Sequence, residues 1–241
     1  MTLSTPRWTA LLCVAAALAL MSACRDSPRS LAPTGTDGGG TQAYTEQLIV
    51  TTDNTVRDMG VGGKETMGIL AYGDSEVRIT GNTVELNRWS SDFGPDQTLA
   101  SCILIFESDG VRVRDNSVRN CDAGIAVGSS AWLGPSADDA VIGDNDVTNA
   151  LVGVFLRPDA FPGFSSADAS TSNAKINGNV LSAGSIGEVG IAITPLDAND
   201  EYDAIARNNK VVRNAISGFA DEQLLDEGTA TRNPGNNAIQ P

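Results

Sequence analysis

Hydrophobic and polar positions along this chain repeat with a period of roughly 30 residues. In each repeat an asparagine follows a small or apolar residue by five positions and precedes an apolar residue by two. The clearest copies are Val77-Arg-Ile-Thr-Gly-Asn82-Thr-Val84 and Val111-Arg-Val-Arg-Asp-Asn116-Ser-Val118. The remaining copies centre on Asn54, Asn145, Asn179 and Asn209, and the six asparagines are spaced by 28, 34, 29, 34 and 30 residues. A repeat of this length that tolerates insertions is typical of a solenoid.

A second apolar pattern follows each of these asparagines after eight to twenty residues. It consists of a small residue and a short hydrophobic run, in the segments Gly68–Ala71, Cys102–Ile105, Gly124–Val127, Gly153–Leu156, Gly190–Ile193 and Gly218–Ala220. Each repeat is therefore predicted to hold two or three short strands and no amphipathic helix. Such short strands bury little within one repeat, so they must pair with the equivalent strands of neighbouring repeats. The pattern predicts an all-β parallel solenoid of about six coils.

The asparagines have a physical reason to recur. A coil must turn sharply between two strands, and asparagine tolerates positive φ better than any residue except glycine. Coils stacked about 4.8 Å apart also align equivalent side-chain amides into a ladder. We therefore expect a ladder of asparagines at positive φ, made of Asn54, Asn82, Asn116, Asn145, Asn179 and Asn209.

From about residue 45 to about residue 220 the order of strand, asparagine turn, strand and long loop resembles the right-handed parallel β-helix of pectate-lyase-like proteins. The resemblance implies a fold and leaves the chemistry open, because the motif specifies coils only. We predict a β-helix domain over residues 44–228 and a tail over residues 229–241 that is loose or forms a partial seventh coil. Residues 219–228 have a helical composition, so a short helix is expected to cap the open end of the solenoid.

Residues 1–23 have the features of a bacterial lipoprotein signal peptide. Arg7 precedes an apolar stretch from Ala10 to Leu20 that is short for a membrane span. Met21-Ser-Ala-Cys24 resembles a lipobox, which implies a lipid on Cys24; the alternative is a plain secreted protein. Residues 24–43 are polar and rich in glycine and proline, as is typical of a flexible tether. We expect an extracytoplasmic protein anchored to the outer membrane or cell surface, because Arg25 supplies no aspartate retention signal.

Charge narrows the set of partners. The 241-residue chain has a formal net charge of −14 at pH 7. Such acidity argues against nucleic acid and against an anionic membrane surface as partners. It also disfavours polyanionic sugars unless a cation bridges them. The chain has no histidine, which excludes epimerase and lyase chemistries that depend on one.

Two cysteines fall in consecutive coils of the predicted stack. Cys102 and Cys121 would lie near each other in an oxidising compartment, so a disulfide is one expectation. The alternative is a pair of buried thiols, since the sequence does not determine the distance between the two Cα atoms.

A basic stripe is expected on the outer face of the strand that precedes each asparagine. Strand alternation points Val77 and Ile79 inward, so Arg78 points outward. The same register puts further cations on this face, namely Arg112, Lys175, Arg114 and Arg207. The stripe is either a solvated face that keeps sheets from adhering or a contact line for an anionic polymer.

The strand after the small residue carries an apolar outer stripe instead. Its predicted members are Leu70, Leu104, Ala126, Phe155, Ala192 and Ala220. The long loops beside it hold several aromatic residues, among them Trp89, Phe93, Trp132, Phe161 and Tyr202. Either these loops fold down and bury their aromatics over the stripe, or they wall a groove in which Phe155 and the loop aromatics stack on sugar rings.

Catalysis would require a base and a neutralised uronate beside that groove. In pectate-lyase-like enzymes the base is often Arg or Lys, and this resemblance points to Arg157 and then Arg88. Ca²⁺ held by Asp138, Asp139 and Asp159 is a possible cofactor, although no spacing determines their geometry. We therefore expect a protein that binds or scaffolds on a polysaccharide of the cell envelope. The alternatives are a polysaccharide lyase or related carbohydrate-active enzyme, and a structural surface spacer.

Overall fold

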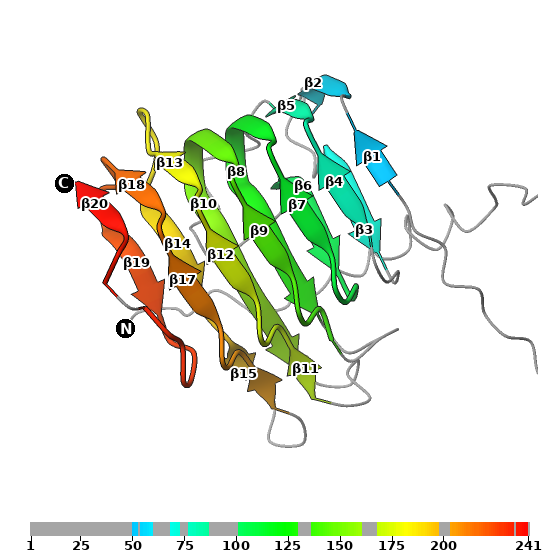
Figure 1. The fold of residues 1–241 in the computed structure, drawn as a ribbon, viewed down its shortest axis with the longest axis vertical. Coiled ribbons are helices and arrows are strands. Elements are labelled where there is room, and N and C mark those ends of the chain that lie inside the picture. Colours follow the sequence, from blue (N-terminus) through cyan, green and yellow to red (C-terminus); the bar gives the residue numbers. More distant parts are fainter. Residues whose placement is uncertain are drawn as a thin grey trace, which may run out of the picture. The chain divides into compact units, whose positions relative to one another are not determined.

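Strands that are one repeat apart in the sequence lie side by side, and every strand pairing among the described residues is parallel (Figure 1). The structure is a computed structural model that describes residues 50–52, 54–59, 68–72, 77–86, 101–129, 136–160, 168–197, 203–233 and 235–240. All of these residues belong to one unit, Glu46–Pro241. Within these ranges no helix has the length and hydropathy of a membrane span.

Six strands form the first face of the coil. In spatial order they are β1 (Val50–Thr52), β4 (Arg78–Thr80), β7 (Arg112–Arg114), β9 (Val141–Gly143), β12 (Lys175–Asn177) and β17 (Lys210–Val212). Each of these strands immediately precedes the turn that leads to the second face, so the pairing runs from coil to coil, as expected.

A 12-stranded sheet forms the other two faces. Its second-face strands are β2 (Thr55–Met59), β5 (Thr83–Leu86), the first part of β8 (Ser117–Ser129), the first part of β10 (Asp146–Ala160), β13 (Val180–Ser182), β18 (Ala215–Ser217) and β20 (Ala238–Gln240). Its third-face strands are β3 (Ile69–Tyr72), β6 (Ser101–Phe106), the later parts of β8 and β10, β14 (Val189–Ile193) and β19 (Glu222–Asp226). The twelfth strand, β15 (Leu196–Asp197), pairs with the end of β10, and β11 (Ala169–Ser170) and β16 (Ala204–Ile205) form a separate two-stranded sheet.

Strands β8 and β10 turn the corner between the second and third faces. Asn120 and Asn149 have positive φ values of 60° and 57° within these strands, and Figure 1 shows both strands bending over. A second ladder of polar side chains lies at this corner. Asn149 Nδ2 donates to Asn120 Oδ1 at 2.8 Å, and Asn120 Nδ2 donates to Glu85 Oε1 at 3.0 Å. This second ladder was not predicted from the sequence.

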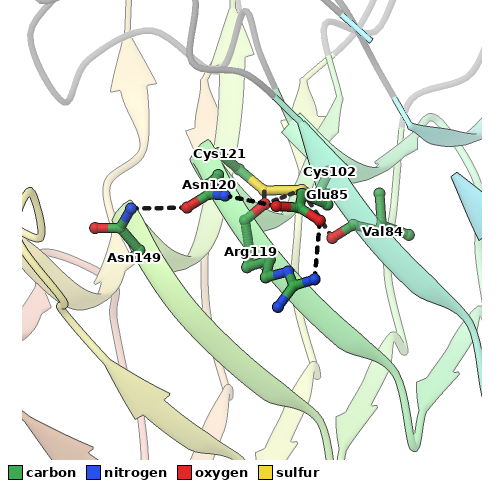
Figure 2. Close-up of a disulfide and its surroundings, with 7 residues drawn as sticks. All are labelled: Val84, Glu85, Cys102, Arg119, Asn120, Cys121 and Asn149. Atoms are coloured by element: carbon green, nitrogen blue, oxygen red, sulfur yellow. Dashed lines mark hydrogen bonds and ion pairs between the residues drawn. A yellow bond between two sulfur atoms is a disulfide. The ribbon is translucent and has the colours of Figure 1, made fainter. Parts of the chain in front are cut away.

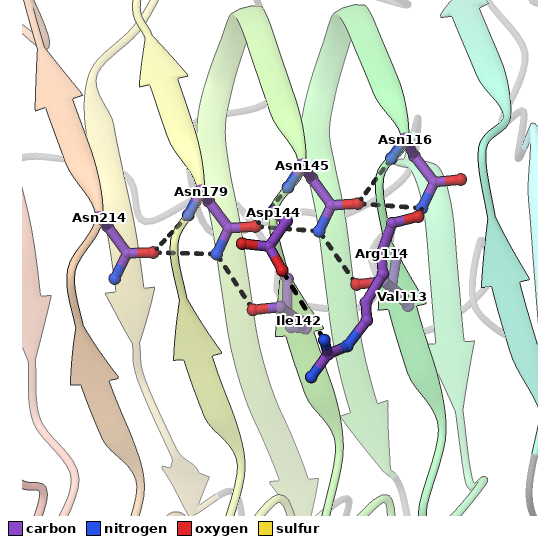
Figure 3. Close-up of polar contacts among 8 residues, drawn as sticks. All are labelled: Val113, Arg114, Asn116, Ile142, Asp144, Asn145, Asn179 and Asn214. Atoms are coloured by element: carbon purple, nitrogen blue, oxygen red, sulfur yellow. Dashed lines mark hydrogen bonds and ion pairs between the residues drawn. The ribbon is translucent and has the colours of Figure 1, made fainter.

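The asparagine ladder exists with one predicted member exchanged and one member added. The backbone N–H and Nδ2 of each asparagine donate to Oδ1 of the next, at 2.9–3.1 Å (Figure 3). Its members are Asn54, Asn82, Asn116, Asn145, Asn179, Asn214 and Asn237.

The prediction for Asn209 was wrong. Asn209 stands five residues before the ladder member Asn214. The equivalent position in other coils holds a buried apolar residue, namely Val111, Ala140 or Ala174. It is itself fully buried, and its Oδ1 accepts from the backbone N–H of Ala174 at 2.8 Å. Because this position holds a polar residue, Asn214 did not match the sequence pattern and was not predicted as the ladder member.

The predicted positive φ of the ladder asparagines was also wrong. The left-handed residue stands one position earlier, at Gly81, Asp115, Asp144, Gly178 and Arg213, with φ from 56° to 70°. The preceding residue makes the turn, and this leaves the asparagine free to bond along the stack.

The last coil differs from the expected helical cap. Residues 222–226 form strand β19, in which Leu224 pairs with Ile191 and Leu225 pairs with Ala192. Pairing with the open edge of β14 overrides the helical propensity of this segment, because it satisfies backbone groups and extends the core. Of the two alternatives for the tail, the described residues form a partial seventh coil, because β20 pairs with β18 and Asn237 extends the ladder.

The core lies inside the coil and consists of stacked aliphatic columns. Ile79, Val113, Ile142, Ile176 and Val211 pair across the first face and are all fully buried. Full burial of one such side chain contributes about 1.5–3 kcal/mol. The glycine before four of the third-face runs is needed for this packing, at Gly68, Gly124, Gly153 and Gly190. A Cβ on Gly124 would lie 2.6 Å from the carbonyl oxygen of Gly153 in the next coil.

Cys102 of β6 and Cys121 of β8 form a disulfide between neighbouring coils (Figure 2). Their Cα atoms are 5.8 Å apart, and both residues are buried. Of the two alternatives that the sequence left open, the structure thus has the disulfide.

Candidate functional site

The outer surface of the third face is the place where the sequence predicted a ligand groove. The strand register stacks six residues there, namely Leu70, Leu104, Ala126, Phe155, Ala192 and Leu225. We call this set the apolar column. Its last member is Leu225 and not Ala220, because β19 supplies the strand of the last coil.

The apolar column is closed over most of its length. Phe155 is 2% exposed, and Leu104, Ala126 and Ala192 are 6%, 2% and 3% exposed. These side chains belong to a second apolar cluster, outside the coil, which also contains Val152 and Val189. The prediction that Phe155 stacks on a sugar ring was therefore wrong for this structure, because its ring is packed among aliphatic neighbours.

Arg157, the preferred base candidate, lies near the end of β10 and is half-buried. Its guanidinium carbon lies 5.8 Å from the centre of the Phe155 ring. Such a cation–π contact contributes about 0.5–2 kcal/mol. The contact gives Arg157 a packing role at the edge of the apolar cluster.

Most other predicted site residues lie outside the described residues. These are Arg88, Trp89, Phe93, Trp132, Phe161, Tyr202 and the lipidation candidate Cys24. The same holds for the side chain of Asp159, whose backbone belongs to β10.

Asp138 is part of a third ladder between coils. Its Oδ1 accepts from the Ser170 hydroxyl at 2.7 Å and from the Ser172 backbone N–H at 2.5 Å. Asp109 in the preceding coil accepts the Asp138 backbone N–H at 2.7 Å. Asp139 is exposed and has a φ of 57°. Among the residues that the structure describes, no group of three or more acidic, Cys or His side chains could hold a metal ion.

The outer surface of the first face carries a column of cations. The register places Arg78 beside Arg112, Arg112 beside Val141, Val141 beside Lys175, and Lys175 beside Lys210. Arg232 continues the series through a bridge to Lys210. We call Arg78, Arg112, Lys175, Lys210 and Arg232 the basic column. Arg78, Arg112, Lys210 and Arg232 are exposed, and Lys175 and Val141 are half-exposed.

The cations of the basic column are not neutralised within the described part of the chain. The ion pairs there are Arg114–Asp144 at 3.7 Å (Figure 3) and Arg119–Glu85 at 2.9 Å (Figure 2), and neither involves the column. Two unit charges about 4.8 Å apart repel by about 1 kcal/mol in water, and salt screens this repulsion. The column therefore costs a little stability unless an anion lies over it.

Only part of the basic column was predicted from the sequence. Arg78, Arg112 and Lys175 each stand four residues before a ladder asparagine, and Lys210 stands four before Asn214. Lys210 was not predicted because the pattern favours Asn209 over Asn214 as the ladder member of that coil. The same error assigned Arg207 to the stripe. Arg207 lies before β17 begins at Lys210, and its backbone pairs with Thr229, so it is not part of the first-face strand.

The family model described as "Right handed beta helix region" matches residues 34–224, most of the chain. The chain belongs to this right-handed β-helix family. The match confirms the predicted all-β, right-handed parallel β-helix fold. No curated protein sequence matches the β-helix protein.

Among solved structures, this β-helix protein is similar to a family 28 exopolygalacturonase of Yersinia enterocolitica. The two share 11% identity, with a TM-score of 0.34. The similarity covers 73% of this chain and 38% of the enzyme, so the β-helix protein spans well under half of the enzyme's length.

Proposed function

We propose that this β-helix protein binds a polysaccharide of the cell envelope and scaffolds on it, without a catalytic step of its own. The observation that carries the proposal is the regular outer surface of the first face. Exposed polar side chains recur there from coil to coil at about 4.8 Å, which is comparable to the advance of one sugar residue in an extended chain. Successive residues of a polysaccharide can therefore meet equivalent cations in each coil except that of Val141.

The environment of the predicted catalytic residues favours binding over catalysis. Arg157 is packed against the Phe155 ring, and Phe155 and its neighbours Ala126 and Ala192 in the apolar column are buried. Asp138, a proposed Ca²⁺ ligand, uses its carboxylate to hold the next coil. These side chains are engaged in holding the fold together.

A panel of neutral and acidic polysaccharides would test the proposal. We expect the purified protein to bind at least one of them, measured by glycan array and calorimetry, and to release no unsaturated product from polyuronates with or without added Ca²⁺. Formation of unsaturated product that disappears in Arg157→Ala would contradict the proposal and establish a lyase. Absence of binding to every polysaccharide would leave the structural spacer as the better description.

The proposed location is the bacterial cell envelope, with a lipid on Cys24. The lipobox-like segment Met21-Ser-Ala-Cys24 supports this assignment. Cells expressing the full chain and labelled with a radioactive fatty acid should yield a labelled protein in the membrane fraction. Cys24→Ala should lose both the label and the membrane association, and a labelled Cys24→Ala protein would rule out this anchor.

A further inference from the structure

We infer that the basic column is a binding site for a linear polysaccharide that bears carboxylates and runs along the stack of coils over the first face. The inference rests on the proposed function and adds the charge of the ligand, its direction and the residues that hold it. The site lies on the first face, whereas the groove predicted from the sequence lies on the third face.

Geometry gives the direction of the ligand. The column residues come from successive coils and are neighbours in register, so the line of cations crosses the strands. From Arg78 to Arg232 the line spans five coil steps, or about 24 Å at the usual strand spacing. An extended polymer with about one carboxylate per sugar can match this spacing over several residues.

The local charge of the column outweighs the acidity of the molecule as a whole at short range. At physiological ionic strength charges beyond about 8 Å are largely screened, so a bound carboxylate responds mainly to its nearest neighbours. Several acids in the neighbouring turns contact groups other than the column cations. Asp144 pairs with Arg114, and the carboxylates of Asp109 and Asp138 accept hydrogen bonds from neighbouring coils. The net charge that disfavours polyanions at a distance therefore does not prevent contact at the column.

A polysaccharide fits the column better than a nucleic acid does. Single-stranded nucleic acids are held by aromatic side chains that stack on bases beside a basic groove. The outward positions of the first face around the column hold Thr80, Arg114, Gly143, Asn177 and Val212, none of which is aromatic.

Val141 divides the column into two contact sites. Arg78 and Arg112 lie on one side of it, and Lys175, Lys210 and Arg232 lie on the other. The arginine pair can bind carboxylates through two parallel hydrogen bonds each, whereas the lysines act as point charges. We therefore expect Val141→Lys to join the two sites and to tighten binding.

The test compares polygalacturonate with the same polymer fully methyl-esterified, which keeps the sugar chain and removes its charge. Binding of the full chain is measured by calorimetry at low and at physiological salt. We expect binding to the acidic polymer only, weaker at higher salt. Arg112→Glu should weaken it about tenfold, which corresponds to about 1.4 kcal/mol, and Val141→Lys should strengthen it. The control Ala215→Glu/Gln240→Glu makes the same change in net charge on the exposed second face and should leave affinity unchanged.

Each contrary result has a distinct meaning. If the esterified polymer binds equally well and Arg112→Glu has no effect, the basic column is not the site, while the proposed polysaccharide binding stands. If no polysaccharide binds at all, the proposed function itself fails. If the second-face control weakens binding as much as Arg112→Glu does, the effect comes from net charge alone, and the basic column is not the binding site. Tighter binding of a single-stranded oligonucleotide, lost in Arg112→Glu, would replace the polysaccharide by a nucleic acid.

Discussion

At the scale of single residues, the ladder asparagines hold the coils in register. Asn145 is 1% exposed, and its Oδ1 accepts from both the backbone N–H and Nδ2 of Asn116. Its own Nδ2 donates to Asn179 Oδ1 and to the backbone carbonyl of Val113. One side chain thus satisfies buried polar groups in the coils before and after it, and no other residue type of this size both donates and accepts in this way.

Asn145→Ala should therefore lower the free energy of unfolding by about 3 kcal/mol or more, because it leaves several buried groups unpaired. Urea denaturation followed by circular dichroism would measure the change. Asn237→Ala is the matched control, because Asn237 is half-buried at the end of the ladder and should cost only about 1 kcal/mol. Equal costs at the two positions would argue against a cooperative, buried ladder.

At the scale of elements, a disulfide links two neighbouring coils, and additional strands cover the C-terminal edge of the sheet. The disulfide joins β6 to β8, and its two cysteines are separated by 19 residues in the chain. At the C-terminal end, β19 covers the edge of β14 and β20 covers the edge of β18. Both features act on strands that pair across coils, and each of these pairings has only three to five paired positions.

Replacing both cysteines, as Cys102→Ser/Cys121→Ser, should destabilise the protein by about 3 kcal/mol, because the closed loop restricts the unfolded chain. Thermal unfolding of the variant would be compared with that of the native protein with and without a reductant. We expect the reductant to lower the melting temperature of the native protein and to leave the variant unaffected. A reductant effect in the variant would assign the loss to something other than this disulfide.

Ending the chain at Glu227 would test the partial seventh coil. The truncation removes Asn237, which accepts from the Asn214 backbone N–H at 2.9 Å and from its Nδ2 at 3.0 Å. It also uncovers Ile216, which is 1% exposed in the complete chain. We expect a loss of about 2 kcal/mol or more in denaturant unfolding, with the β-sheet signal retained. An unchanged midpoint would show that the tail contributes nothing to the stack.

At the scale of the whole molecule, charge is distributed unevenly. A net charge of −14 makes the molecule repel itself, and the basic column adds a local repulsion of the opposite sign. Both repulsions are weakened by salt. The fold is thus expected to be least stable at low ionic strength.

Raising the NaCl concentration from a few millimolar to a physiological level should therefore raise the melting temperature. If salt raises the free energy of unfolding by about 1 kcal/mol, the melting temperature of a domain of this size rises by about 2–4 °C. Differential scanning calorimetry in NaCl and in KCl would separate general screening from the binding of one ion. A falling melting temperature in both salts would mean that attractions between opposite charges dominate the native state.

Sequence reasoning succeeded for features that depend on neighbours along the chain. Strand alternation correctly turned Ile79 inward and Arg78 outward, because the two-residue period of a strand is a local property. It failed where two patterns competed within one segment. Asn209 and Asn214 both lie in a plausible turn context, and the apolar residue expected five positions earlier favoured the wrong one.

By itself, the sequence determined that this protein is a parallel solenoid with an aliphatic interior, an asparagine ladder and cations on one outer face. The repeat was enough because each coil buries the same columns. Tertiary structure alone decided that Asn214 holds the ladder, that residues 222–226 extend a sheet, that Phe155 is buried, and that Lys210 and Arg232 complete the basic column. These outcomes depend on which strands from distant parts of the chain become neighbours, and that pairing is set by the packing and hydrogen bonding of the whole stack.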